Sequence, residues 1–138
     1  MFEGDNPVRS VKLLNEPKTK VRFLEPKEEH RLLKAAAPPL ASLIVICLDT
    51  GLRLALEALT LKWEHVDLKR GLLSVAGTYA KSWELRTVPL SNAAKAALTT
   101  LQAARTGEFV FTKRNGEVYT SMREAFDGAR DRAPGCPM

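Results

Sequence analysis

Residues 40–53 read LASLIVICLDTGLR, and this stretch carries the strongest local pattern in the sequence. The run 43–48 is apolar at every position, which is typical of a helix at the centre of a core. Gly51 ends the pattern, because glycine readily adopts the left-handed backbone conformation that closes many helices. The stretch therefore predicts a buried helix over 40–49 and, after the break, a further helix over 52–61.

Caps and periodicity predict three more helices outside this stretch. The first has Pro26 in its first turn, where the missing proline N–H costs nothing, and Pro38-Pro39 beyond its end. The second begins after Ser91, a favourable N-cap residue. The three helices are predicted over residues 24–37, from Ser91 to Ala104, and from the capping box Ser121-Met-Arg-Glu124 to Arg132.

Three short segments, 72–75, 86–90 and 109–111, have the composition of strands. A polar stretch separates the first two, which favours a hairpin, and Asn115-Gly116 favours a tight turn. Helices followed by a small sheet and then by helices again indicate the α+β class. We expect a mainly helical domain with a small three-stranded antiparallel sheet.

The composition is that of one globular domain: 138 residues, of which 45% are apolar and 27% charged. No apolar run approaches the roughly 18 residues of a membrane span. The first residues lack the basic and apolar regions of a secretory signal. Cys47 and Cys136 are too few for a disulfide framework. These features predict a cytoplasmic protein with no membrane association.

The sequence offers no motif for a metal or a cofactor. His30 and His65 each lack a metal-ligating residue three or four positions further along the chain. The glycine fingerprints of phosphate and dinucleotide binding do not occur, nor does the G-x-S-x-G motif of many hydrolases. We therefore expect no metal and no small-molecule cofactor, and hydrolase, nucleotidase and dehydrogenase functions have no support.

The net charge of +5 favours a polyanionic partner. Part of the excess lies in residues 1–22, which contain Pro7 and Pro17 and have no sustained periodicity. Two interpretations stand: a solvated terminal segment, or a basic arm that follows a DNA phosphate backbone. The basic residues of this segment are Arg9, Lys12, Lys18, Lys20 and Arg22.

Arg53 is unusual because the helix dipole disfavours a cation in the first turn of a helix, where the predicted helix over 52–61 places it. An anion held between Arg53 and free backbone N–H groups would reverse that cost. Alternatively, Arg53 pairs with Glu57 one helical turn further along. Both interpretations remain open from the residues alone.

Lys81 lies in the polar stretch between the two predicted strands of the hairpin. Most lysines in such a place are simply solvated. The alternative is a mobile ammonium group that a flexible hairpin brings to a phosphate, with Arg86 as a second cation on the same ribbon.

Taken together, these motifs resemble the tyrosine recombinases, the phage integrase family, from end to end. The segments that carry the resemblance are Asn6-Pro-Val-Arg9, Phe23-Leu-Glu-Pro26, Thr50-Gly-Leu-Arg53, Glu57 to Asp67, Leu72-Leu-Ser-Val75, Lys81, Arg86-Thr-Val-Pro-Leu-Ser91, Phe109-Val-Phe111 and Arg123-Glu-Ala-Phe126.

The resemblance implies that Arg53 contacts the scissile phosphate of double-stranded DNA and that Lys81 is the acid that protonates the leaving 5′-hydroxyl. Such enzymes break and rejoin DNA through a 3′-phosphotyrosine without a metal or cofactor. Cations around the phosphorane would stabilise the charge of the transition state. Arg86 and the basic residues of the arm are expected to contact DNA.

Two features depart from the family pattern. The family usually has Glu three residues after the arginine, whereas Glu57 is four after Arg53. Either a bulge absorbs the extra residue or Arg53 is misaimed, because one residue rotates a helix by about 100°. The match also does not reach the family's His-x-x-Arg box, its later His or Trp, or its nucleophile, and neither Tyr79 nor Tyr119 matches the nucleophile's place.

The sequence thus predicts residues 1–22 as a basic arm or linker and residues 23–138 as the N-terminal portion of a tyrosine-recombinase catalytic domain. The function expected is that of a DNA-binding fragment of a site-specific recombinase, with self-association through an apolar face that is left exposed. The alternatives are a non-catalytic DNA-binding or interaction module on the same scaffold, and a stable remnant with no activity.

Overall fold

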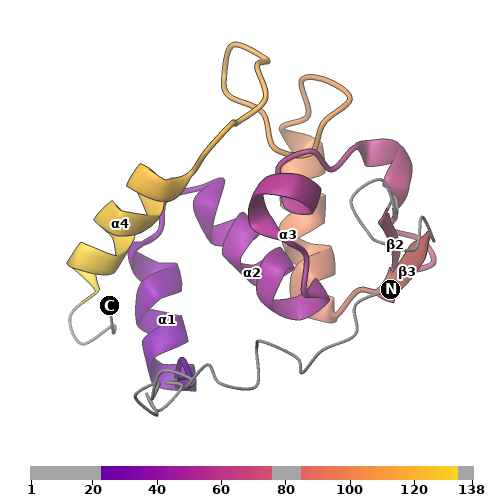
Figure 1. Cartoon of the computed structure of the whole chain (residues 1–138). Helices are drawn as coiled ribbons and strands as arrows, with labels where there is room; N and C mark the ends of the chain where they lie inside the picture. Colours follow the sequence, from indigo (N-terminus) through magenta and orange to yellow (C-terminus); the bar gives the residue numbers. More distant parts are fainter. Residues whose placement is uncertain (1–22, 76–84, 134–138) are drawn as a thin grey trace, which may run out of the picture.

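The computed structural model describes residues 23–75 and 85–133. Two helices, α1 (Pro26–Ala35) and α4 (Arg123–Arg132), pack side by side at one end of the molecule, and a small sheet lies at the other end (Figure 1). Between them lie α2 (Leu40–Thr50) and α3 (Asn92–Ala103), which pack against each other. The mainly helical α+β fold is as predicted.

The helices predicted over 24–37 and 40–49 are confirmed as α1 and α2. Before α1, the backbone N–H of Glu25 donates to Oε2 of Glu28 at 3.0 Å, which satisfies a donor that the helix leaves free. The α2 helix ends at Gly51, whose φ of 65° is left-handed and whose N–H donates to the carbonyl of Cys47 at 2.9 Å. Gly51 therefore fixes where the chain leaves the core helix.

The predicted helix over 52–61 is wrong. The structure has instead a five-residue π-helix, η2 (Leu54–Ala58), and then a short 3₁₀-helix, η3 (Trp63–His65). The N–H groups of Ala58 and Leu59 each donate at 3.0 Å to a carbonyl five residues earlier. A π-turn holds one residue more than an α-turn, and this wider turn takes the place of a regular helix.

The three-stranded antiparallel sheet is confirmed, but one of its strands was misassigned. Its order is β1-β2-β3, with β1 at Val66–Asp67, β2 at Leu72–Val75 and β3 at Arg86–Pro89. Strands β2 and β3 pair as predicted, with Leu73 opposite Val88. Residues 109–111 were expected as the third strand but pair only through one isolated bridge.

Residues 109–111 lie against the segment before the sheet because backbone hydrogen bonds hold them there. The N–H of Trp63 donates to the carbonyl of Glu108 at 2.9 Å, and the N–H of Val110 donates to the carbonyl of Leu61 at 2.8 Å. The predicted turn at Asn115-Gly116 is present, with Gly116 at a φ of 86°. This arrangement buries Phe111 completely.

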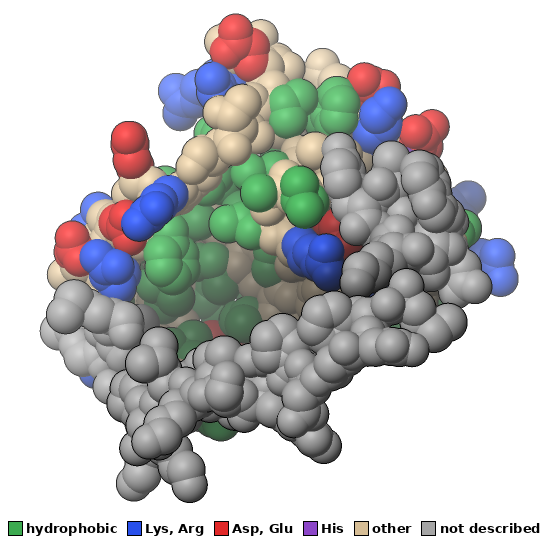
Figure 2. Space-filling view, viewed as in Figure 1, with side chains coloured by type: hydrophobic (Ala, Val, Ile, Leu, Met, Phe, Trp, Pro, Cys, Tyr) green, Lys and Arg blue, Asp and Glu red, His purple; other side chains and the backbone are tan. Residues whose placement is uncertain are grey.

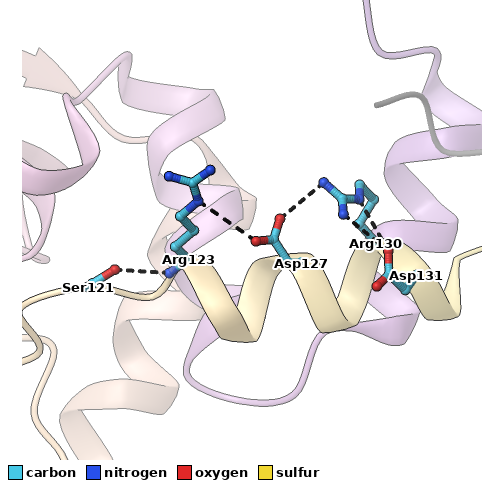
Figure 3. Close-up of polar contacts among 5 residues, drawn as sticks. All are labelled: Ser121, Arg123, Asp127, Arg130 and Asp131. Carbon is cyan, nitrogen blue, oxygen red and sulfur yellow. Dashed lines mark hydrogen bonds and ion pairs between the residues drawn. The ribbon is translucent and has the colours of Figure 1, made fainter.

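Helix α3 begins as predicted: the Ser91 hydroxyl accepts a hydrogen bond of 3.2 Å from the N–H of Ala94. The capping box predicted for α4 is wrong, because the N-cap residue is Met122, whose side chain is buried. Ser121 lies one residue too early and instead accepts from the N–H of Arg123 at 3.2 Å (Figure 3).

The core is continuous through all these elements. Its largest side chains with no appreciable exposure are Phe111, Leu43, Ile46, Leu59, Leu73 and Leu98. Within the described ranges, no helix has the length and apolar character needed to cross a membrane.

Candidate functional site

One carboxylate joins two of the predicted functional cations. Oε2 of Glu57 accepts a hydrogen bond of 2.9 Å from the backbone N–H of Arg53 and lies 3.5 Å from Nη2 of Arg86. The side chain of Glu57 is only 12% exposed, whereas that of Arg86 is 52% exposed. The π-helix and strand β3 are therefore linked through a largely buried anion.

Arg53 lies immediately before η2, with an extended backbone (φ −73°, ψ 121°) and an exposed side chain. One interpretation of the sequence required a free Arg53 N–H to bind an anion. That N–H instead donates to Glu57 and is not available. The predicted contact with Glu57 exists but goes through the backbone rather than the guanidinium. The Arg53 guanidinium forms no ion pair with any residue in 23–75 or 85–133.

The extra residue between Arg53 and Glu57 is absorbed by the π-helix. The N–H of Ala58 donates to the carbonyl of Arg53, and that of Leu59 donates to the carbonyl of Leu54, each across five residues. This widening takes up the additional position and lets the Glu57 carboxylate reach the N–H of Arg53. The π-helix thus supplies the widened turn that the bulge alternative requires, and the aim of Arg53 stays a prediction.

Of the other predicted cations, only Arg86 lies among the residues that the structure describes. Arg86 begins β3 opposite Val75 and is half-exposed beside Glu57. Lys81, Tyr79 and the basic residues Arg9, Lys12, Lys18, Lys20 and Arg22 lie outside the described residues.

A second set of cations lies on α4, but carboxylates of the same helix neutralise it (Figure 3). Asp127 lies 3.0 Å from Nη1 of Arg130 and 3.8 Å from Nε of Arg123. Asp131 lies 3.2 Å from Nη2 of Arg130. These pairs are individually weak, but each of the two cations has a carboxylate beside it, which makes this helix surface a weaker candidate than Arg53 for binding a phosphate.

An apolar groove runs between α2, η2 and α4, where Figure 2 shows hydrophobic side chains gathered in a hollow. Its volume is about 200 Å³. Three of its members are large and solvent-exposed: Leu48 is 55% exposed, Leu54 is 46% exposed and Phe126 is 39% exposed. The lining residues are Leu40, Leu43, Ile44, Cys47, Leu48, Leu54, Met122 and Phe126.

Burial in the wall of this groove raises the pKa of the Cys47 thiol to about 11. The thiol is therefore protonated at neutral pH and is a poor nucleophile. Among the described residues, no group of three or more His, Cys, Asp or Glu side chains is placed to hold a metal ion.

The ion pair of Glu57 with Arg86 was not predicted from the sequence. The two residues are 29 positions apart in the sequence. Helix and strand periodicities predict contacts only between residues that are close in sequence, so they give no signal for this pair. The one available signal is that Glu57 is a lone acid in the apolar run 54–59. A buried carboxylate needs a partner, but only the fold shows which cation supplies it.

The family model for the phage integrase family matches residues 22–133. The integrase of Haemophilus phage HP1 (strain HP1c1) is 30% identical over 133 residues, which cover 94% of this chain and 34% of that protein. The integrase of Escherichia phage P2 is 34% identical over 93 residues, which cover 67% of this chain and 26% of that protein. The matched regions thus make up about a quarter to a third of these relatives.

Solved structures share the fold. The catalytic domain of bacteriophage HP1 integrase matches with a TM-score of 0.56 at 28% identity, covering 85% of this chain and 64% of that domain. XerA recombinase matches with a TM-score of 0.69 at 19% identity, covering 92% of this chain and 47% of that one. The Tn1549 transposon integrase in complex with transposon right end DNA matches with a TM-score of 0.72 at 20% identity, covering 91% and 49%.

Proposed function

We propose that this chain, which belongs to the phage integrase family, is a DNA-binding part of the catalytic domain of a site-specific recombinase. Residues 23–138 would be the N-terminal portion of that domain, and residues 1–22 a basic arm or linker. The whole protein would break and rejoin double-stranded DNA through a 3′-phosphotyrosine.

The position of Arg53 is the observation that carries this proposal. It is an exposed cation without an ion pair to any residue in 23–75 or 85–133, and Glu57 holds its backbone. The held backbone sets the point from which the side chain projects, and an exposed guanidinium without an ion-pair partner is suited to a phosphate oxygen. In this proposal Arg53 contacts the scissile phosphate.

Lys81 would complete the chemistry by protonating the leaving 5′-hydroxyl, as the family resemblance implies. The basic residues Arg9, Lys12, Lys18, Lys20 and Arg22 would follow the DNA backbone from the arm and supply affinity without sequence preference. Such binding would take place in the cytoplasm.

The apolar groove supports self-association of the 138-residue chain. Large exposed apolar surfaces on soluble domains mark interaction sites, and Leu48 and Phe126 lie together on this one. A second copy of the chain that covers the groove would remove these side chains from water.

The test is a titration of fluorescein-labelled duplex DNA with the chain at several salt concentrations, read by fluorescence anisotropy. We expect weak binding that falls steeply with salt, and a salt slope that decreases by about 1 in Arg53→Ala. Arg123→Ala, whose guanidinium faces Asp127, is the matched control and should change the slope much less.

Salt-independent binding, or no binding at low ionic strength, would contradict the proposal. Equal losses in Arg53→Ala and Arg123→Ala would instead favour the alternative, a non-catalytic module that binds DNA through general charge.

A further inference from the structure

We propose that Arg86 is a positioning residue, which holds Glu57 and through it Arg53, and is not itself a ligand of DNA phosphate. This inference rests on the proposed function, in which Arg53 contacts phosphate. It departs from the role that the sequence alone suggests for Arg86, which is a direct contact with DNA.

The shared carboxylate oxygen is the first support. Oε2 of Glu57 accepts from the Arg53 N–H at 2.9 Å and faces Nη2 of Arg86 at 3.5 Å. The Glu57 side chain is 12% exposed, and a carboxylate so far removed from water requires compensation for its lost hydration. Arg86 supplies the opposite charge, whereas the Arg53 guanidinium does not pair with Glu57.

The second support is the way in which the two elements are held. Arg86 belongs to β3, where antiparallel pairing with β2 fixes it opposite Val75. The core holds the segment around the π-helix through Leu52, Ala58 and Leu59, which are buried, whereas Leu54 and Leu56 between them are exposed. The pair with Arg86 therefore links the turn between these buried residues to the sheet.

Removing Arg86 would leave the Glu57 carboxylate without its cation. The carboxylate would regain hydration by turning toward solvent, and the Arg53 N–H would then lose its acceptor. The Arg53 side chain would remain present and charged, but the backbone from which it projects would no longer be held. A direct ligand of phosphate behaves differently, because its loss adds to the loss of Arg53.

A double-mutant cycle distinguishes these two roles. Dissociation constants for a labelled duplex are measured for the unaltered chain, Arg53→Ala, Arg86→Ala and the double variant. Each single substitution should weaken binding about threefold to tenfold. The double variant should bind within about twofold of Arg53→Ala alone, because Arg86 acts only through Arg53.

Two further variants serve as controls. Arg114→Ala removes an exposed cation elsewhere, and its effect should multiply with that of Arg53→Ala. Arg86→Lys keeps the charge and should restore part of the binding lost in Arg86→Ala. Losses that multiply in the Arg53/Arg86 cycle, as they do for Arg114, would overturn the proposal.

Amide hydrogen exchange, followed by NMR without DNA, tests the link itself. The Arg53 amide should exchange about tenfold faster in Arg86→Ala, while core amides such as that of Leu73 stay protected. Unchanged Arg53 exchange would overturn the proposal. Faster exchange in a chain that binds no DNA would refute the proposed function and leave Arg86 a purely structural role.

A loss of protection throughout the core would show that Arg86→Ala is globally destabilised. In that case Arg86→Gln, which retains most of the side-chain volume, replaces it in both experiments. Losses that multiply in the cycle, or an unchanged exchange rate of the Arg53 amide, would then overturn the proposal.

Discussion

Oδ2 of Asp49 accepts a hydrogen bond of 3.0 Å from the backbone N–H of Ser91, 42 positions further along the chain. Asp49 is in the last turn of α2, and Ser91 caps the start of α3. The bond therefore links the end of α2 to the beginning of α3. It also fixes the point at which the chain turns at Gly51 and leads into Arg53.

We expect Asp49→Ala to lower the free energy of unfolding by about 1 kcal/mol, because it removes this charge-assisted hydrogen bond. The bond is exposed to water, which limits its contribution. Urea denaturation followed by circular dichroism measures the change. Asp131→Ala removes an exposed carboxylate that, among residues 23–75 and 85–133, pairs only with its neighbour Arg130, and its effect should stay within about 0.5 kcal/mol. Equal effects of the two substitutions would show that the Asp49–Ser91 bond contributes nothing.

Gly71→Ala should destabilise the fold by about 1 to 2 kcal/mol, because the backbone of Gly71 is left-handed. Gly71 has a φ of 67°, and a Cβ there would meet only the end of the Lys95 side chain, which is flexible and moves aside at little cost. Gly51→Ala shares the positive φ and has open space around it, so it should show a similar cost. Gly107, without a positive φ, should tolerate alanine.

The Gly71 series is read by urea denaturation. Adding Lys95→Ala to Gly71→Ala should recover little of the loss, because the backbone cost remains. The account is wrong if the Gly71 and Gly107 variants are equally stable.

Phe126→Ser should weaken self-association of the 138-residue chain, because Phe126 lines the apolar groove and is 39% exposed there. Removing it takes apolar area from the surface that a second copy would cover. Sedimentation velocity over a range of concentrations measures the effect. Leu85→Ser, at an exposed apolar residue outside the groove lining, is the control. A chain that stays monomeric at high concentration would contradict the prediction.

The 138-residue chain alone should not cleave DNA. The covalent route of the family needs a tyrosine in line with the phosphate and a full set of cations, of which the proposed function supplies only Arg53 and Lys81. The measurement is a nicked suicide duplex incubated with the chain and analysed on a denaturing gel. A protein–DNA adduct that disappears in Tyr79→Phe would refute this prediction.

The elements that could be predicted from the sequence are those with a local cause. Gly51 ends α2 because of its own backbone freedom, and Ser91 caps α3 with its own hydroxyl. The helix expected over 52–61 was wrong because periodicity does not distinguish an α-turn from a π-turn that is held by a side chain. Likewise, 109–111 has the composition of a strand but pairs with residues 61–63, which only tertiary packing decides.

For the site, the sequence identified single residues but not their connections. Arg53 stood out as a cation in an apolar segment, and the structure leaves it exposed. The role of Arg86 could not be foreseen, since its partner Glu57 comes from an element 29 residues earlier. Lys81 lies outside the described residues, and its role stays a prediction.

The most direct test of the central claim, that Arg53 is the cation presented to DNA phosphate, is an NMR titration of the labelled chain with duplex DNA at low salt. Both backbone amides and arginine Nε–H groups are observed. The account predicts large shifts at Gly51, Leu52 and Arg53 and small ones at Arg123 and Arg130, whose charges are paired on α4. Shifts confined to α4, with Arg53 unchanged at saturation, would contradict it.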